Sequence, residues 1–196
     1  MSSSDQPRKH PKIAIGLVHY PIVDGQKRVV ATNVTNFDIH DIARAARVYG
    51  IEKYYIIHPI PEQLMFVERV LDHWRVGTGS KYNPMRRTAL TMVKTAETVE
   101  KALQDWGVEN ALTIATHARV VERAQTYSFS DMKKTLFEGD QPVFLLFGTG
   151  FGLTEDFMRS CSGVLEPVKG AGPTDYRHLS VRSAVSIILD RLLGSW

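Results

Sequence analysis

The feature that most constrains the fold is an alternation of short apolar runs with segments of helical periodicity. Four runs of strand length consist mostly of apolar residues, without alternating polar positions, at residues 13–19, 54–58, 111–116 and 143–147. Strands of this kind are typical of a parallel sheet with helices on both faces, because neither strand face meets water. The alternation therefore predicts an α/β domain with a parallel sheet.

Helical patterns fill the intervals between these runs. Helices are expected at residues 38–49, 61–75, 96–106, 130–137, 154–160 and 179–193, and further short strands at 88–93 and 164–168. We expect a polar, glycine-containing loop at residues 77–87 and a second glycine-rich loop at 169–175. Residues 1–11 are predicted to be a disordered tail, and residues 12–196 a single domain without repeats or a linker.

Composition excludes several classes of site. Cys161 is the one cysteine, so an intrachain disulfide and a site built from several thiolates are impossible, which favours a reducing, cytoplasmic setting. No stretch reaches membrane-spanning length, and the start lacks the apolar core of a signal peptide. The histidines do not show metal-ligand spacing, so no metal is expected. Lys and Arg number 24 against 21 Asp and Glu, a mild indication of a polyanionic partner.

The segment FLLFGTGFGL, residues 144–153, joins a predicted strand to a predicted helix through Gly148, Gly150 and Gly152. A P-loop would require Lys followed by Ser or Thr after the last glycine, and Leu153-Thr154 stand there instead. The G-x-G-x-G spacing also differs from the dinucleotide fingerprint. Two interpretations remain open, a ligand-binding turn and a tight turn that binds nothing.

A second glycine-rich segment favours the ligand. Gly170 and Gly172 follow the predicted strand at 164–168 and precede a polar cluster and the last helix. Ligands of open α/β sheets bind outside the carboxyl ends of the strands, and two neighbouring strands would bring both loops to that edge. The two loops together predict a binding site there.

Three segments in this order resemble the SPOUT, or alpha/beta-knot, RNA methyltransferases, and a small stand-alone bacterial group among them in particular. The segments are TNFDIHDIARAARVYGI (35–51), FLLFGTGFGL (144–153) and DYRHLSVRSAVSIILDRL (175–192). The resemblance implies a Rossmann-like parallel sheet with a C-terminal trefoil knot, S-adenosylmethionine as cofactor, and RNA, either tRNA or rRNA, as substrate. It also implies a homodimer with the active site near the subunit interface.

The resemblance assigns the cofactor to three loops: the one after residue 116, the glycine turn, and the segment 165–180. The cofactor-binding residues it implies are Thr116, Phe147, Gly148, Thr149, Gly150, Gly152, Leu165, Pro167, Val168, Tyr176, His178, Leu179, Ser180 and Ser183. One departure stands out, since many relatives have Ser-Leu-Asn where this chain has His178-Leu179-Ser180. Ser180 either replaces that Asn or caps the last helix.

The resemblance also points to Asn36, Arg44 and Asp175 as catalytic residues. If the accepting atom is a guanine ring nitrogen, Asp175 is the candidate base; if it is a ribose 2′-hydroxyl, Arg44 carries more of the role. Two plainer interpretations stay open. Arg44 is a solvated arginine paired with Asp41 or His40 along the helix, and Asp175 is a turn residue.

RNA binding is expected at basic residues around the 76–87 loop, with Trp74 and Tyr82 among them, because basic and aromatic side chains together suit unstacked bases. These residues are Arg69, Arg75, Lys81, Arg86 and Arg87. The alternative is a solvated loop with Trp74 in the core. For the whole chain, the alternative function is a non-catalytic RNA- or nucleotide-binding module of the same fold. A generic mononucleotide-binding α/β enzyme is a weaker third hypothesis.

Overall fold

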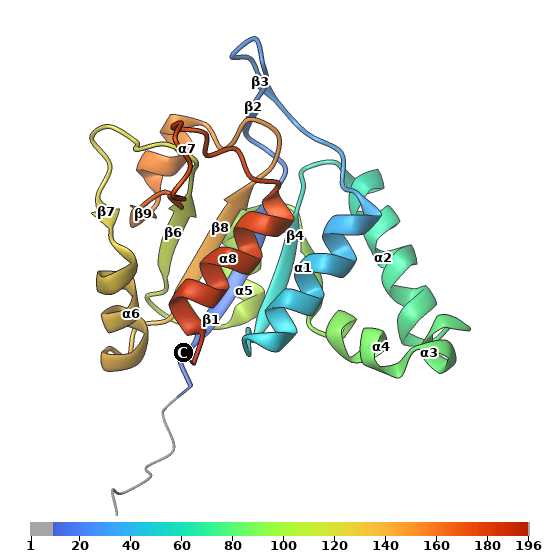
Figure 1. The fold of residues 1–196 in the computed structure, drawn as a ribbon. Coiled ribbons are helices and arrows are strands. Elements are labelled where there is room, and N and C mark those ends of the chain that lie inside the picture. The colour runs from blue at the N-terminus through green and yellow to red at the C-terminus, as the bar shows by residue number, and fades with distance from the viewer. Residues whose placement is uncertain (1–9, 196) are drawn as a thin grey trace, which may run out of the picture.

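A seven-stranded sheet organises the molecule. The computed structural model describes residues 10–195, except the side chain of Ser80; the predicted tail therefore lies, over residues 1–9, outside the described part. The strands are β1 (Ile13–Val18), β4 (Lys53–Ile57), β5 (Val93–Ala96), β6 (Leu112–Thr116), β7 (Thr126–Tyr127), β8 (Val143–Gly148) and β9 (Gly163–Leu165). Their order is β5-β4-β1-β8-β6-β9-β7, and every neighbouring pair is parallel, as predicted (Figure 1).

Helices cover both faces of the sheet, which confirms the predicted class. One core contains alternate residues of β1, such as Ile13 and Ile15, and packs under α1 (Asn36–Val48), α2 (Pro61–Arg75), α4 (Pro84–Leu90), α6 (Phe129–Glu138) and α8 (Val181–Leu193). The residues between them, such as Ala14 and Val18, face the second core under α5 (Val99–Trp106) and α7 (Glu155–Ser160). A strand buried on both sides must be apolar at every position, which explains the continuous runs.

The strand order brings the glycine-rich segments to one edge. Val18 is in register with Gly148 across β1 and β8, and Thr116 with Leu165 across β6 and β9. Because these strands are parallel, the chain leaves β6, β8 and β9 at the same end of the sheet, the upper end in Figure 1. A C-terminal trefoil knot stays a prediction.

Two expectations about the 77–93 region were wrong. In place of a loop followed by a strand, residues 79–90 form α3 (Gly79–Tyr82) and α4, and β5 begins only at Val93. The reason is a helix start that the loop assignment overlooked. The Asn83 side chain accepts a hydrogen bond from the backbone N–H of Arg86 at 3.0 Å, and Pro84 opens α4.

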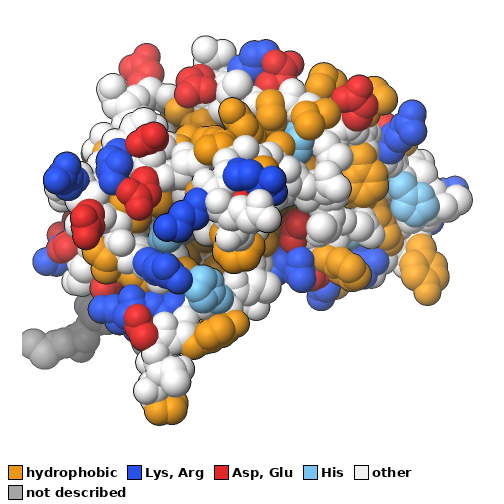
Figure 2. All heavy atoms as spheres, turned by 90° about the horizontal axis from the view of Figure 1, so that it is seen from above, with side chains coloured by type: hydrophobic (Ala, Val, Ile, Leu, Met, Phe, Trp, Pro, Cys, Tyr) orange, Lys and Arg blue, Asp and Glu red, His pale blue; other side chains and the backbone are white. Residues whose placement is uncertain are grey.

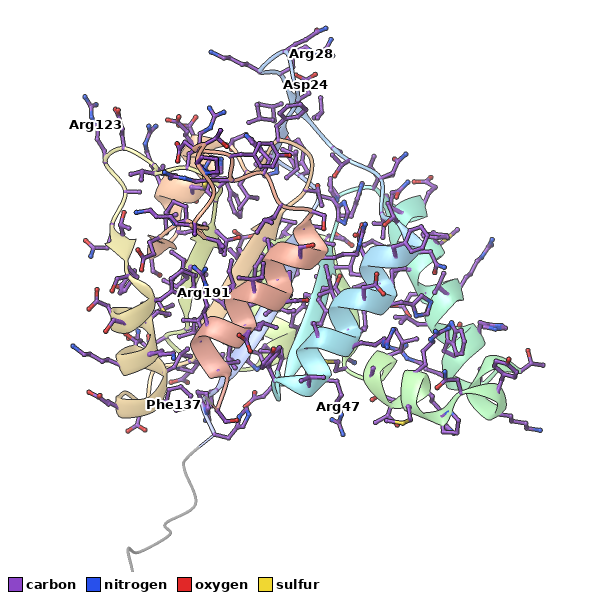
Figure 3. The ribbon with its side chains drawn as sticks, viewed as in Figure 1. Asp24, Arg28, Arg47, Arg123, Phe137 and Arg191 are labelled. Atoms are coloured by element: carbon purple, nitrogen blue, oxygen red, sulfur yellow. The ribbon has the colours of Figure 1, made fainter. Side chains whose placement is uncertain are left out.

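The two-residue strands went unpredicted because they carry too little periodicity to be detected. They are β2 (Ile22–Val23) and β3 (Val29–Val30), which form a small hairpin, and β7. Asp24 and Arg28 lie at the tip of this hairpin, which stands above the sheet (Figure 3). Among the helices of residues 10–195, none is long and apolar enough to cross a membrane.

Candidate functional site

A cavity of about 390 Å³ opens at the carboxyl ends of the central strands. Its walls come from the segment between β3 and α1, the loop after β6, the glycine turn after β8, and the start of α8. The side chains that line it are both apolar, as Phe147, Val168 and Ile188, and polar or charged, as Thr32 and Arg182. Its volume lies within the range of pockets that hold small organic ligands.

The glycine turn has a backbone that other residues would strain. Gly150 has a φ of +55° and Gly152 a φ of +105°, values that L side chains rarely adopt. A Cβ on Gly152 would lie 3.0 Å from the ring of His117, and a Cβ on Gly148 would lie 2.8 Å from the backbone nitrogen of Leu153. The glycines therefore let the chain turn tightly here and keep the cavity wall thin.

The segment that carries the β2–β3 hairpin holds this turn in place. The backbone N–H of Val23 donates to the carbonyl of Gly152 at 2.9 Å, and the hydroxyls of Thr32 and Thr149 are 2.5 Å apart. The N–H of Gly152 donates to the carbonyl of Thr149 at 2.9 Å and closes the turn. Because Thr32 and Thr149 both line the cavity, these contacts fix two of its walls to each other.

Two buried histidines support Thr32 from behind. His19 Nδ1 lies 3.0 Å from the Thr32 hydroxyl, and His58 Nε2 donates to the Thr32 carbonyl at 3.0 Å, since His58 Nδ1 already accepts from the N–H of Ile60. Burial and, to a lesser degree, the neighbouring His58 together lower the pKa of His19 to about 4. Burial also lowers the pKa of His58. Both rings are therefore neutral at pH 7.

An ion pair between a buried carboxylate and a partly exposed arginine joins the two helices at the cavity. Arg182, in the first turn of α8, donates through Nη1 to Asp38 Oδ1 at 2.7 Å, and the Thr35 hydroxyl donates to Asp38 Oδ2 at 2.6 Å. Asp38 and Arg182 line the cavity, yet neither was among the predicted site residues. The one local signal is Thr35 three residues before Asp38, which indicates a helix start and not a ligand site.

Ten of the fourteen predicted cofactor-binding residues line this cavity. The four that do not are Leu165, Pro167, Tyr176 and Ser183. The first two are buried, while Tyr176 is exposed. The backbone N–H of Ser183 donates to the Ser180 hydroxyl at 3.2 Å. Ser180 therefore caps α8, which is one of the two roles predicted for it.

The predicted catalytic residues are divided between two places. Asn36 and Arg44 line a second hollow of about 620 Å³ between α1 and α2, on the other side of α1 from the cavity. Asp175 is exposed in the segment before α8 and forms an ion pair with Arg177, whose side chain lines the cavity. The structure thus brings Asp175 close to the cavity rim and leaves Arg44 outside the cavity.

The predicted RNA-binding residues are also divided. Arg69 and Arg86 line the second hollow, while Lys81 and Arg87 are exposed elsewhere. Arg75 donates to the carbonyl of Val93 at 2.7 Å and pairs with Glu68, so it serves the packing of α2 on β5.

The surface at the carboxyl end of the sheet carries Lys and Arg side chains beside hydrophobic ones (Figure 2). Within residues 10–195, no group of three or more His, Cys, Asp or Glu side chains has metal-binding geometry.

The fold places the chain in a class of known structures. A probable methylase family protein from Haemophilus influenzae superposes with a TM-score of 0.61 at 18% identity, over 93% of this chain and 65% of that one. The SpoU methyltransferase AviRb from Streptomyces viridochromogenes, solved in complex with the cofactor AdoMet, superposes with a TM-score of 0.53 at 14% identity, over 98% of this chain and 62% of that one. The fold is therefore that of the SpoU-type methyltransferases.

Sequence comparison gives the family. Residues 12–194 match a family model described as SAM-dependent RNA methyltransferase, and the chain belongs to that family. An uncharacterized protein of Aquifex aeolicus is 39% identical over 93% of this chain and 88% of its own length. A tRNA (guanine-N(1)-)-methyltransferase of Oleidesulfovibrio alaskensis is 40% identical over 99% of this chain, which spans only 45% of that enzyme. The predicted resemblance to S-adenosylmethionine-dependent RNA methyltransferases is confirmed, and the family favours an enzyme over a binding module.

The neutral histidines predict that acid destabilises the protein. A histidine whose pKa is about 4 when folded and 6.5 when unfolded binds its proton more readily in the unfolded state. The free energy of unfolding should therefore fall as the pH falls from about 6.5 to about 4, by roughly 3 kcal/mol from His19 alone. Urea unfolding at several pH values in this window measures the slope.

Two variants test the assignment. His19→Asn keeps a polar atom near Thr32 and should flatten the pH dependence, whereas His178→Asn, at an exposed histidine, should leave the slope as in the wild type. An unchanged slope in His19→Asn would show that the acid sensitivity arises elsewhere.

Proposed function

We propose that this chain binds S-adenosylmethionine in the cavity at the glycine turn and transfers its methyl group to an RNA. The observation that carries the proposal is the convergence of the turn, the loop after β6 and the start of α8 on one cavity, with ten of the predicted cofactor contacts in its wall. Family membership supports the cofactor and the RNA class of substrate. The cavity suits the cofactor, because its thin glycine wall admits an adenine and its polar and charged side chains suit the amino acid part.

When bound, S-adenosylmethionine supplies an electrophilic methyl group. The residues of the chain then have to orient the accepting atom and take up its proton. Asp175 is the carboxylate next to the cavity rim, held by Arg177, and we assign it to proton removal if the accepting atom is a guanine ring nitrogen. Arg44 is assigned to the nucleotide phosphate, and carries the larger role if the accepting atom is a ribose hydroxyl.

We propose tRNA as the RNA to be tested first. The support is the name of the Oleidesulfovibrio alaskensis relative and of a second one, from Nitratidesulfovibrio vulgaris, at 38% identity. This chain spans less than half of either enzyme, so the methylated atom has to be identified from the product.

Cofactor binding is the first prediction of this proposal. S-adenosylmethionine and S-adenosylhomocysteine should bind in a calorimeter, in preference to ATP and NAD. Gly152→Ala should weaken this binding about tenfold or more, because the residue must hold a strained φ and its Cβ would meet His117. Gly170→Ala is the matched control, since its Cβ meets nothing within 4 Å. Tighter binding of ATP or NAD would contradict the proposal.

Methyl transfer is the second prediction. Unmodified tRNA incubated with protein and labelled S-adenosylmethionine should gain methyl groups, and digestion to nucleosides should show which atom carries them. A methylated guanine ring should disappear with Asp175→Ala, and a ribose methyl group with Arg44→Ala, while cofactor binding remains in both variants. Methylation that survives both substitutions would remove both residues from the mechanism.

The third prediction is that the protein forms a homodimer. Three exposed hydrophobic side chains surround the cavity mouth, Phe151 and Leu179 in its lining and Tyr176 beside them, and a second copy that covered them would bury apolar surface. Sedimentation should then give twice the chain mass of 22.1 kDa. Leu179→Glu should yield monomers, whereas Val48→Glu, at a more exposed hydrophobic position on α1, should not. A wild-type monomer would refute this proposal.

A further inference from the structure

The hollow between α1 and α2 is rich in arginine. Its lining includes Arg44 from α1, Arg69 from α2 and Arg86 from α4, and Asp41 is the one acidic residue in that lining. Asp41 is turned toward Arg182, whose Nε lies 3.7 Å from its carboxylate. The positive charge of the hollow is therefore largely uncompensated from within.

Two of these arginines are available to a ligand. Arg44 and Arg69 are exposed, and neither has an ion pair or hydrogen bond to a side chain in the described part of the protein. Arg86 differs, because its guanidinium lies 4.8 Å above the Trp74 ring and is held there. Arg75, also on α2, is bonded to Glu68 and to the backbone of Val93, and its guanidinium is therefore not available to a ligand.

The same hollow exposes aromatic rings. Phe66 is 40% exposed and Phe37 is 68% exposed, and both line it. Trp74 also lines the hollow, is packed partly on the core, and lies edge-to-face with the rings of His40 and His73. Exposed phenyl rings beside unpaired guanidinium groups suit a ligand that is both aromatic and anionic.

His40 supplies a further unsatisfied group. Its Nδ1 is buried and has no hydrogen-bond partner among residues 10–195. Burial lowers the pKa of His40, and the charges of Arg86 and Arg44 lower it further, against the opposing effect of Asp41. The lowered pKa reflects burial first and then the positive charge that Arg86 and Arg44 bring to the hollow, and the buried Nδ1 leaves a polar atom there without a partner in the described part of the protein.

The hollow and the cavity are both lined by residues from the first turns of α1. Asp38 lines the cavity, whereas Phe37 and Asp41, its neighbours along the helix, line the hollow. Arg182 pairs with Asp38 and lies 5.7 Å from the Phe37 ring, so it touches both places. A helix is about 10–12 Å across, which a strand of a few nucleotides can span.

We propose that the hollow between α1 and α2 binds an unpaired nucleotide of the RNA substrate, flanking the one that enters the cavity. Phe66 and Phe37 stack on its base, and Arg44 and Arg69 hold its phosphates. The ligand is single-stranded, because only an unstacked base can enter a concave site lined by rings. This inference rests on the proposed function, and it assigns the RNA strand to a defined path on the protein.

Fluorescence anisotropy with a labelled single-stranded RNA of about 12 nucleotides tests the site. Phe66→Ala should weaken binding about fivefold or more, and Arg69→Ala should reduce the slope of log K against log salt by about 0.7. The matched controls are Phe137→Ala, at a phenylalanine of 42% exposure, and Arg47→Ala, both at the lower end of the molecule in Figure 3. Both controls should stay within about twofold of the wild type.

Calorimetry with S-adenosylmethionine on the same variants separates this inference from the proposed function. All four variants should bind the cofactor as the wild type does; a wild-type protein that binds none would refute the proposed function itself. Unchanged RNA affinity and salt slope in Phe66→Ala and Arg69→Ala would overturn the inference. A change of sedimentation in place of RNA affinity would also overturn it, since the hollow would then be a subunit contact.

Discussion

The buried carboxylate of Asp38 is the polar contact that ties the start of α1 to the start of α8. It receives the guanidinium of Arg182 and the hydroxyl of Thr35, and the backbone carbonyl of the same residue accepts from the Tyr54 hydroxyl at 3.2 Å. A buried carboxylate without its partner is costly, so the two helices are held in one arrangement. That arrangement forms a wall of the cavity on one side of α1 and a wall of the arginine-rich hollow on the other. The positions of both sites therefore depend on this ion pair, together with the apolar core that α1 and α8 share and the hydrogen bond from the Tyr49 hydroxyl to Asp190.

The glycine turn is the second fixed element, and its support is indirect. The turn alone is a short loop, but the segment from Val23 to Thr32, which contains the turn of the β2–β3 hairpin, holds it through the carbonyl of Gly152 and the hydroxyl of Thr149. His19 and His58 complete this support from the interior. A cavity wall that is already ordered needs little rearrangement to bind a ligand, and methyl transfer depends mainly on holding two substrates in line.

The features that depend on neighbouring residues could be predicted from the sequence, whereas those that depend on contacts between distant residues could not. Apolar strands and the glycine turn were predicted because each is visible within about ten residues. The α3–α4 region was mistaken for a loop because Asn83 and Pro84 look like turn residues until they are seen as a helix start. Asp38 was missed because its partner Arg182 is 144 residues away in the sequence. Arg75 was wrongly grouped with the RNA-binding residues because the sequence does not reveal that its guanidinium bonds to the carbonyl of Val93. The knot, the single domain, the dimer and the catalytic assignments stay predictions.

The most direct test of the account is a crystal structure with S-adenosylhomocysteine. The account predicts that the ligand lies in the cavity, in contact with the backbone between Gly148 and Gly152 on one side and with the segment before α8 on the other. Its sulfur should face the opening beside Arg177 and Arg182, where an accepting nucleotide can approach. A ligand bound in the α1–α2 hollow, or a cavity that stays empty in the presence of the ligand, would contradict the central claim.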